Sequence, residues 1–297
     1  MTFVWHLLFS IANLIPLALA YSFLLGRGRV QNWGPVGAAL VAAYGIFVPL
    51  SWGQNYLWAA LIGLVLVSLV SLLYTWLVLR LPGDAFGVMA IAVHLAILTI
   101  VLNWTAVTRG ALGIPNVPRP ALIADGTVFI LTTTFVSLLW IVLMVRIDRS
   151  SVGRQLTALG EHDIYARALG INRAAILAVA FLLVGAGTWI DTLFSIPYIH
   201  LLHPNDYQFP TFIFLLTIVI AARPGNIPGT VLSTALLVLL REGLRFVKVP
   251  MMTSSGLVFS YIPAQILGPT RLLLFGIILF TAVFVRRDQL FPRPRTV

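Results

Sequence analysis

The 297-residue sequence contains no cysteine, one lysine and only nine acidic residues. Without cysteine, disulfides, thiol catalysis and cysteine-ligated metal are excluded. The lysine, Lys248, is followed by Val249, so the chain lacks the Gly-Lys-Ser/Thr of a phosphate-binding P-loop and does not hydrolyse ATP by that route. The patterns H-E-x-x-H and G-x-S-x-G are also missing, and apart from His200 and His203 the five histidines are not at metal-ligand spacing. We therefore expect no enzyme, no bound metal and no cofactor.

Long apolar runs dominate what is present. Hydrophobic residues make up 60% of the chain, charged residues 9%, and the mean hydropathy is +0.99. Such runs match the ~30 Å hydrocarbon core of a bilayer, where backbone polar groups have to be satisfied within one segment. The sequence predicts an all-α, polytopic transmembrane helix bundle of about nine spans in a single domain, residues 1–297. We place the spans at 3–25, 34–50, 56–79, 85–104, 127–147, 174–198, 209–222, 226–246 and 269–286. The segments 34–50 and 209–222 are short for full crossings.

The basic residues predict the orientation of these spans. With the N-terminus outside, 13 of the 19 basic residues fall on the cytoplasmic side and six on the other. The reverse orientation inverts that ratio. The same rule accounts for the net charge of +10, so we expect lipid and no nucleic acid as a partner. The C-terminus is then predicted to be cytoplasmic.

One long polar segment, residues 148–172, interrupts the spans on the predicted cytoplasmic side. An apolar ridge suited to the groove of a partner is predicted on one helical face, formed by Thr157, Ile164, Ala168 and Ile171. Asp163 and Arg167 have the favourable i,i+4 order of an ion pair. Gly170 is placed to end the short helix.

Two ionisable side chains within the spans are candidates for a transport pathway, because charge in lipid is costly. Asp191 lies about 27 Å along its helix from Arg173, near the outer interface. His94 lies about 15 Å beyond Asp84, near the midplane. The alternative for His94 is a hydrogen-bonded packing residue. Together they do not form the carboxylate chain of a proton-coupled transporter.

The polar segment resembles the cytoplasmic coupling segment of permeases in the branched-chain amino-acid ABC importer family. The positions that carry the likeness, and that the resemblance implies contact a partner ATPase, are Gly153, Glu161, Ile164, Ala166, Arg167, Ala168, Leu169 and Gly170. Further stretches in the same order, among them Arg80 to Asp84 and Thr108 to Pro115, resemble the LivM-like type of the two permease types.

The start of the second span also resembles the family but departs from it. Gly26, Gly34, Ala43 and Tyr44 agree with the family pattern, whereas Asn32 and Pro35 stand where it carries Ser and His. We predict a substrate pathway that includes Gln31, Asn32, Gly34, Pro35, His94 and Asp191. The alternative is a plain helix start with Asn32 as its N-cap. Gly and Pro lead the spans 34–50 and 226–246, which suggests an inverted repeat or, equally, close helix packing.

The resemblance implies a permease subunit of a bacterial inner-membrane ABC importer for branched-chain or related small amino acids. Urea or an amide is a further substrate option. The implied partners are a LivH-like second permease, two cytoplasmic ATPase subunits that bind the ATP, and an extracytoplasmic substrate-binding protein. Two alternatives stay open: a gradient-driven carrier, and a non-transporting membrane subunit or membrane enzyme.

Overall fold

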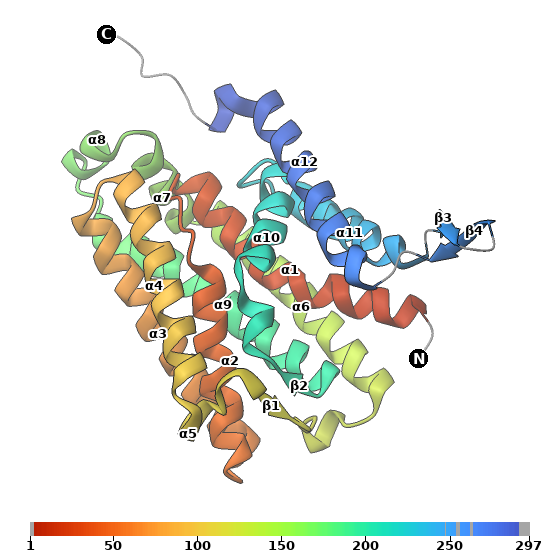
Figure 1. Cartoon of the computed structure of the whole chain (residues 1–297). Helices are drawn as coiled ribbons and strands as arrows, with labels where there is room; N and C mark the ends of the chain where they lie inside the picture. The colour runs from red at the N-terminus through yellow and green to blue at the C-terminus, as the bar shows by residue number, and fades with distance from the viewer. Residues whose placement is uncertain (1–2, 247, 254–255, 262–263, 291–297) are drawn as a thin grey trace.

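The computed structural model describes residues 3–246, 248–253, 256–261 and 264–290 as a bundle of long helices (Figure 1). Each predicted span appears as a helix: α1 Phe3–Arg27, α2 Pro35–Ser51, α3 Tyr56–Arg80, α4 Gly83–Asn103, α6 Gly126–Arg149, α9 Arg173–Ile199, α10 Phe209–Ala222, α11 Ile227–Gly243 and α12 Ala264–Leu290. Within the described ranges, seven helices are long and apolar enough to cross a membrane, while α2 and α10 are shorter. The all-α polytopic bundle is confirmed; the number of nine crossings stays a prediction.

Short elements connect the spans. They are α5 Thr105–Thr108, η1 Gly110–Leu112, β1 Ile114–Pro115, η2 Ala121–Ile123, α7 Ser151–Glu161, α8 Asp163–Ala168, β2 Leu201–Leu202, η3 Pro204–Tyr207, η4 Leu244–Phe246, β3 Lys248–Thr253 and β4 Gly256–Tyr261. Strand β1 pairs antiparallel with β2, and β3 with β4 from Lys248↔Tyr261 to Thr253↔Gly256. The sequence did not predict these strands, because they are far shorter than the apolar runs from which the spans were inferred.

Several spans begin at a polar side chain that accepts hydrogen bonds from the first free backbone amides. Such caps replace intrahelical partners that the first turn lacks. They are Asn55 before α3, Asp125 before α6, Asn172 before α9 and Asn226 before α11. These residues explain why the helices start within a few residues of the predicted positions.

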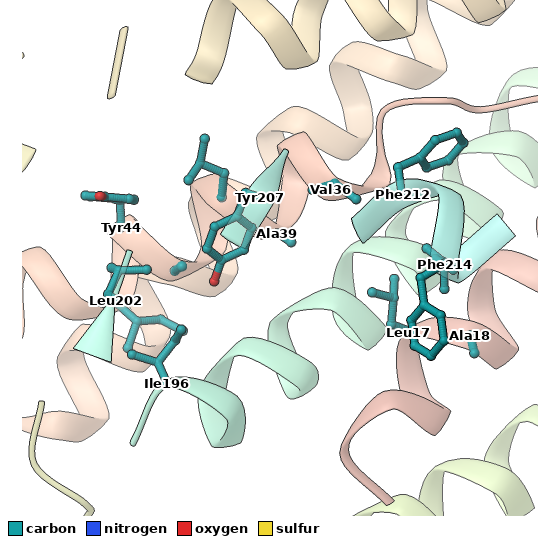
Figure 2. Packing of buried hydrophobic residues seen from close by; sticks show 14 of the residues in the cluster. Leu17, Ala18, Val36, Ala39, Tyr44, Ile196, Leu202, Tyr207, Phe212 and Phe214 are labelled. Carbon is teal, nitrogen blue, oxygen red and sulfur yellow. The ribbon is translucent and has the colours of Figure 1, made fainter. Parts of the chain in front are cut away.

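Helix α1 is the centre of the bundle, since it packs against α6, α9 and α11, while α3 covers α2 and α9. The largest buried cluster joins α1, α2, α9 and α10, with Leu17, Val36 and Phe214 among its members (Figure 2). Outer helices expose apolar side chains such as Val65 on α3 and Val88 on α4. An apolar helix that is only partly buried by protein suits a lipid-facing position.

Helix α2 begins inside the bundle rather than at its end, after a non-helical stretch over residues 28–34 (Figure 1). Tyr21, six residues before α1 ends and therefore about 9 Å inside, donates a 2.8 Å hydrogen bond to the Asn32 carbonyl. Tyr74 of α3 donates one of 3.0 Å to the Gly34 carbonyl. Non-helical backbone at membrane depth is tolerated where protein satisfies it in this way.

Helix α10 begins at a similar depth. The ring of Phe212, in its first turn, lies 6.0 Å from the ring of Trp33 and 6.4 Å from that of Tyr21. As the sequence predicted for 34–50 and 209–222, the two short spans are α2 and α10. The other span led by Gly and Pro, 226–246, has membrane length, because α11 continues through η4 to residue 246. The inverted repeat stays a prediction.

Candidate functional site

The predicted coupling segment forms two helices, α7 and α8, at one end of the bundle (Figure 1). His162, with φ −148° and ψ 85°, breaks the helix between them. Gly170 has φ +86°, and its N–H donates to the Arg167 carbonyl while the Ile171 N–H donates to the Ala166 carbonyl. This pair of bonds is the Schellman helix ending. The predicted helix end at Gly170 is confirmed.

The predicted ridge on a single helical face is wrong. Because the helix breaks at His162, Thr157 lies on α7 while Ile164 and Ala168 lie on α8. The Thr157 hydroxyl donates to the Gly153 carbonyl at 2.9 Å, and Ile171 packs against the buried core. Only Ile164 and Ala168 are exposed members of the predicted ridge.

A different apolar surface is exposed on α8. Ile164, Tyr165 and Leu169 are 73%, 70% and 83% exposed. Exposed polar and small residues surround them: Glu161, Arg167, Ala168 and Gly170. We call these seven residues the α8 surface. Asp163 holds it in place, because its carboxylate pairs with Arg167 at 3.1 Å, as predicted, and with Arg173 of α9 at 3.2 Å.

Two of the eight predicted coupling residues are buried and lie outside the α8 surface. Ala166 is 3% exposed and packs against the chain's own core. Gly153 is also buried, and a side chain there would clash with the Asp148 carbonyl where α6 turns into α7. Both residues hold α7 and α8 against the bundle instead of presenting a face to a partner.

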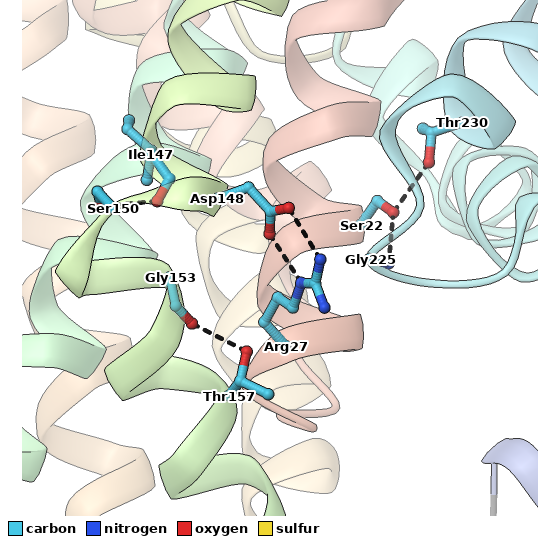
Figure 3. Close-up of polar contacts among 9 residues, drawn as sticks. All are labelled: Ser22, Arg27, Ile147, Asp148, Ser150, Gly153, Thr157, Gly225 and Thr230. Carbon is cyan, nitrogen blue, oxygen red and sulfur yellow. Dashed lines mark hydrogen bonds and ion pairs between the residues drawn. The ribbon is translucent and has the colours of Figure 1, made fainter.

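Polar contacts at the same end tie α1 to the end of α6, where α7 follows, and to the start of α11 (Figure 3). Arg27, the last residue of α1, donates from Nε and Nη2 to the Asp148 carboxylate at 2.7 and 2.8 Å. Ser22 Oγ accepts from the Gly225 N–H at 3.0 Å and contacts Thr230 Oγ1 at 2.9 Å. These contacts join the end of α6 to α1, and α1 to the turn that precedes α11.

The predicted pathway residues at the start of α2 pack inside the protein. Gly34 is the N-cap of α2 and Pro35 its first residue. Asn32 is buried, and its Oδ1 accepts from the Gly34 N–H at 3.0 Å, so the alternative that Asn32 is itself the N-cap is wrong. A side chain at Gly34 would clash with the Tyr74 hydroxyl. Gln31 is half-buried beside them.

His94 of α4 is buried against α2. A Cβ added to Gly37 would lie 3.1 Å from both Cβ and Nδ1 of His94. The His94 Nδ1 atom has no hydrogen-bond partner among the described residues. This position fits close packing of α4 on α2.

Asp191 lines a cavity of about 570 Å³ between α1, α9, η3, α10, α11 and α12. Asn13 Nδ2 donates to Asp191 Oδ1 at 2.6 Å. The other acidic and arginine side chains that line the cavity are Asp206, Arg241, Glu242, Arg245 and Arg271. Of the six predicted pathway residues, Asp191 is the one that lines this cavity; His94 and the residues at the start of α2 lie elsewhere.

Glu242 is the most buried charge in the cavity wall, at 3% exposure. Its carboxylate pairs with Arg241 at 3.1 Å, Arg245 at 3.2 Å and the His6 ring at 3.5 Å. A buried carboxylate needs such partners to stay charged. Sequence reasoning missed it, although an acidic residue between two arginines at the end of an apolar helix was a usable signal.

Asp206, in the connection between α9 and α10, adds a second carboxylate to the wall. Burial raises the pKa of its carboxyl above the ordinary value, and the charge of His203 partly opposes this. Among the described residues, no three His, Cys, Asp or Glu side chains come together in a way that could hold a metal ion.

A known protein family and individual relatives match most of the chain. Residues 3–283 match the family described as "Branched-chain amino acid transport system / permease component". The "High-affinity branched-chain amino acid transport system permease protein LivM" of Escherichia coli K12 is 26% identical over 293 residues, 80% of this chain and 68% of that protein. The protein of that name from Salmonella typhimurium is 28% identical over 196 residues, 57% of this chain and 46% of that protein. A structure of PsaBC from Streptococcus pneumoniae in complex with Fab gives a TM-score of 0.49 at 13% identity, covering 96% of this chain and 92% of the other.

Proposed function

The chain belongs to the family of permease components of branched-chain amino acid transport systems, and we propose that it is one permease subunit of an ATP-driven importer. Its substrate is a branched-chain or related small amino acid. Two cytoplasmic ATPase subunits bind and hydrolyse ATP, because this chain has no P-loop. A LivH-like permease and an extracytoplasmic binding protein complete the assembly in a bacterial inner membrane, with the N-terminus of this chain outside.

The α8 surface carries this proposal. Three large apolar side chains stand exposed on a helix that lies at one end of the bundle, next to charged Glu161 and Arg167. Clustered apolar side chains on a polar segment mark a protein interaction site. A short helix with an apolar face is a common way of fitting a groove on a partner. We assign the α8 surface as the contact with an ATPase subunit.

Two polar contacts support the mechanism: that of Arg27 with Asp148 and that of Ser22 with the Gly225 N–H. When the ATPase subunits close, they pull on the α8 surface and, through α7, on the end of α6. Asp148 of α6 passes the movement to Arg27 of α1, and Ser22 of α1 passes it to the turn before α11. Helices α1 and α11 border the cavity around Asp191. Alternating access then arises from rigid movement of packed helices.

The test is a single charge in the α8 surface. Leu169→Asp should reduce co-purification with co-expressed ABC ATPase subunits and abolish ATP-dependent amino-acid uptake. Leu122→Asp is the matched control, because Leu122 is 96% exposed in η2, outside the α8 surface. Membrane insertion should be normal in both variants. Undiminished ATPase association with Leu169→Asp would remove the α8 surface as the docking site.

A further inference from the structure

Among the described residues, the half-buried Asp191 and Arg271 of the cavity wall have no ion-pair partner within 4.0 Å, and neither has the exposed Asp206. Asp191 contacts the neutral Asn13 and forms no ion pair within 4.0 Å in the described part of the chain. The Nε and Nη2 atoms of Arg271 are buried and have no hydrogen-bond partner among the described residues. Glu242 contrasts with them, since two guanidiniums and a histidine ring surround it.

We propose that this cavity is a binding site for a zwitterion. Its ammonium group binds Asp191 and the Oδ1 atom of Asn13, and its carboxylate binds Arg271. This inference rests on the proposed transport function and assigns the substrate contacts within it. Asn13 strengthens the assignment, because the residue is only 7% exposed and its Oδ1 atom has no hydrogen-bond partner among the described residues. An ammonium donates three hydrogen bonds, and the bond from Asn13 to Asp191 makes their acceptor groups neighbours.

The charge balance of the wall favours a ligand that carries both signs. Three carboxylates, Asp191, Asp206 and Glu242, face three guanidiniums, Arg241, Arg245 and Arg271. A cation would satisfy only the acceptors at Asp191 and an anion only the donors of Arg271, whereas a zwitterion satisfies both. Urea and simple amides carry no charge and satisfy neither group ionically. The cavity therefore selects amino acids over the neutral substrates that the sequence left open.

The remaining wall suits an aliphatic side chain. The apolar members of the lining include Leu14, Leu17, Val36, Ala39, Ile196 and Leu215. Leu17 is one helical turn beyond Asn13 toward the α7 end, about 6 Å deeper along α1. Polar groups that fix orientation above a mainly apolar lining are the usual composition of a small-molecule site. The ligand would lie with its charged groups at Asn13 and its side chain pointing inward.

Binding to the purified full chain, measured by calorimetry, tests the site with three probes. Leucine carries both charges, leucinamide lacks the carboxylate, and 4-methylpentanoate lacks the ammonium. We expect the wild-type chain to prefer leucine to either analogue by about tenfold or more. Asp191→Asn should abolish the preference over 4-methylpentanoate and keep the preference over leucinamide. Arg271→Gln should do the reverse.

The ratios of the affinities for leucine and for each analogue distinguish the loss of a direct contact from misfolding. A structural defect weakens the binding of all three probes together and leaves these ratios unchanged. Asp84→Asn and Arg80→Gln remove exposed charges away from the cavity and should leave both ratios unchanged. Absence of saturable leucine binding, or unchanged ratios in Asp191→Asn and Arg271→Gln, would overturn the proposal. The measurement uses no ATPase, so a failed docking test with Leu169→Asp would not affect it.

Discussion

Arg27 at the end of α1 donates two hydrogen bonds, of 2.7 and 2.8 Å, to the carboxylate of Asp148 at the end of α6. These residues are 121 positions apart, and the pair is a direct polar link between the central helix and the end of the helix that leads into α7. Bidentate geometry makes such a pair directional as well as attractive. It is placed to transmit movement from the α8 surface to the bundle.

Breaking this pair should reduce coupling. We expect Arg27→Gln to leave ATPase association intact, to lower substrate transported per ATP hydrolysed, and to reduce stability by about 1 kcal/mol or less, because both groups are partly exposed. The double variant Arg27→Asp with Asp148→Arg should recover part of the coupling. The measurement is uptake and ATP hydrolysis in proteoliposomes that contain the complete transporter. A normal ratio of substrate transported to ATP hydrolysed in Arg27→Gln would contradict a role of the Arg27–Asp148 pair in transmitting movement.

Gly170 tests the geometry of α8. Its φ of +86° disfavours any side chain, and no atom lies within 4 Å of an added Cβ, so the cost of Gly170→Ala is purely conformational. We expect a loss of about 1 kcal/mol of stability and weaker ATPase association. Gly243→Ala on α11 has equally open space without a positive φ and should be neutral or stabilising. Equal melting temperatures of the two variants would argue against the positive φ.

Ala166 and Ala168 separate packing from docking. Ala166 is buried in the core while Ala168, two residues on, is exposed in the α8 surface. Ala166→Arg should lower the yield of folded protein, because it forces a charge into a packed interior. Ala168→Arg should insert and fold normally but bind the ATPase subunits less tightly. Size-exclusion profiles measure folding, and co-purification measures ATPase binding. Normal folding of Ala166→Arg together with misfolding of Ala168→Arg would show that the buried and exposed faces of α8 are assigned the wrong way round.

Asn32 is expected to act on structure and not on specificity. Asn32→Ser keeps a hydrogen-bond acceptor for the Gly34 N–H and should cost about 1 kcal/mol or less, whereas Asn32→Leu leaves that amide buried and unpaired and should cost more. Both should retain the wild-type ranking of amino-acid substrates. Val30→Leu serves as the local control. A changed ranking in Asn32→Ser would return this residue to the substrate pathway.

His94 distinguishes ATP-driven transport from a proton-coupled carrier. His94→Gln keeps a polar group of similar size beside Gly37, and we expect energised uptake to persist with an unaltered dependence on pH. Uptake in cells that lack the ATPase subunits, measured with and without a protonophore, provides the comparison. Transport that survives ATPase removal and collapses with the protonophore would favour the gradient-driven carrier.

The sequence by itself determined the helices. Apolar runs of membrane length can satisfy their backbone within one segment only as helices, so the nine predicted segments reappear from α1 to α12. Local chemistry also determined the end of α8 at Gly170 and the pairing of Asp163 with Arg167, since both depend on residues at most five positions apart.

The tertiary structure decided which side chains those helices bring together. Asn13, Asp191 and Arg271 come from α1, α9 and α12, and no local pattern relates them. The burial of Ala166, the depth at which α2 begins and the pairing of Arg27 with Asp148 likewise depend on packing between distant segments. Hydropathy determines which residues leave water, but it does not distinguish one apolar packing partner from another. Shape and polar contacts between helices therefore select the arrangement, and the charged cavity around Asp191 follows from it.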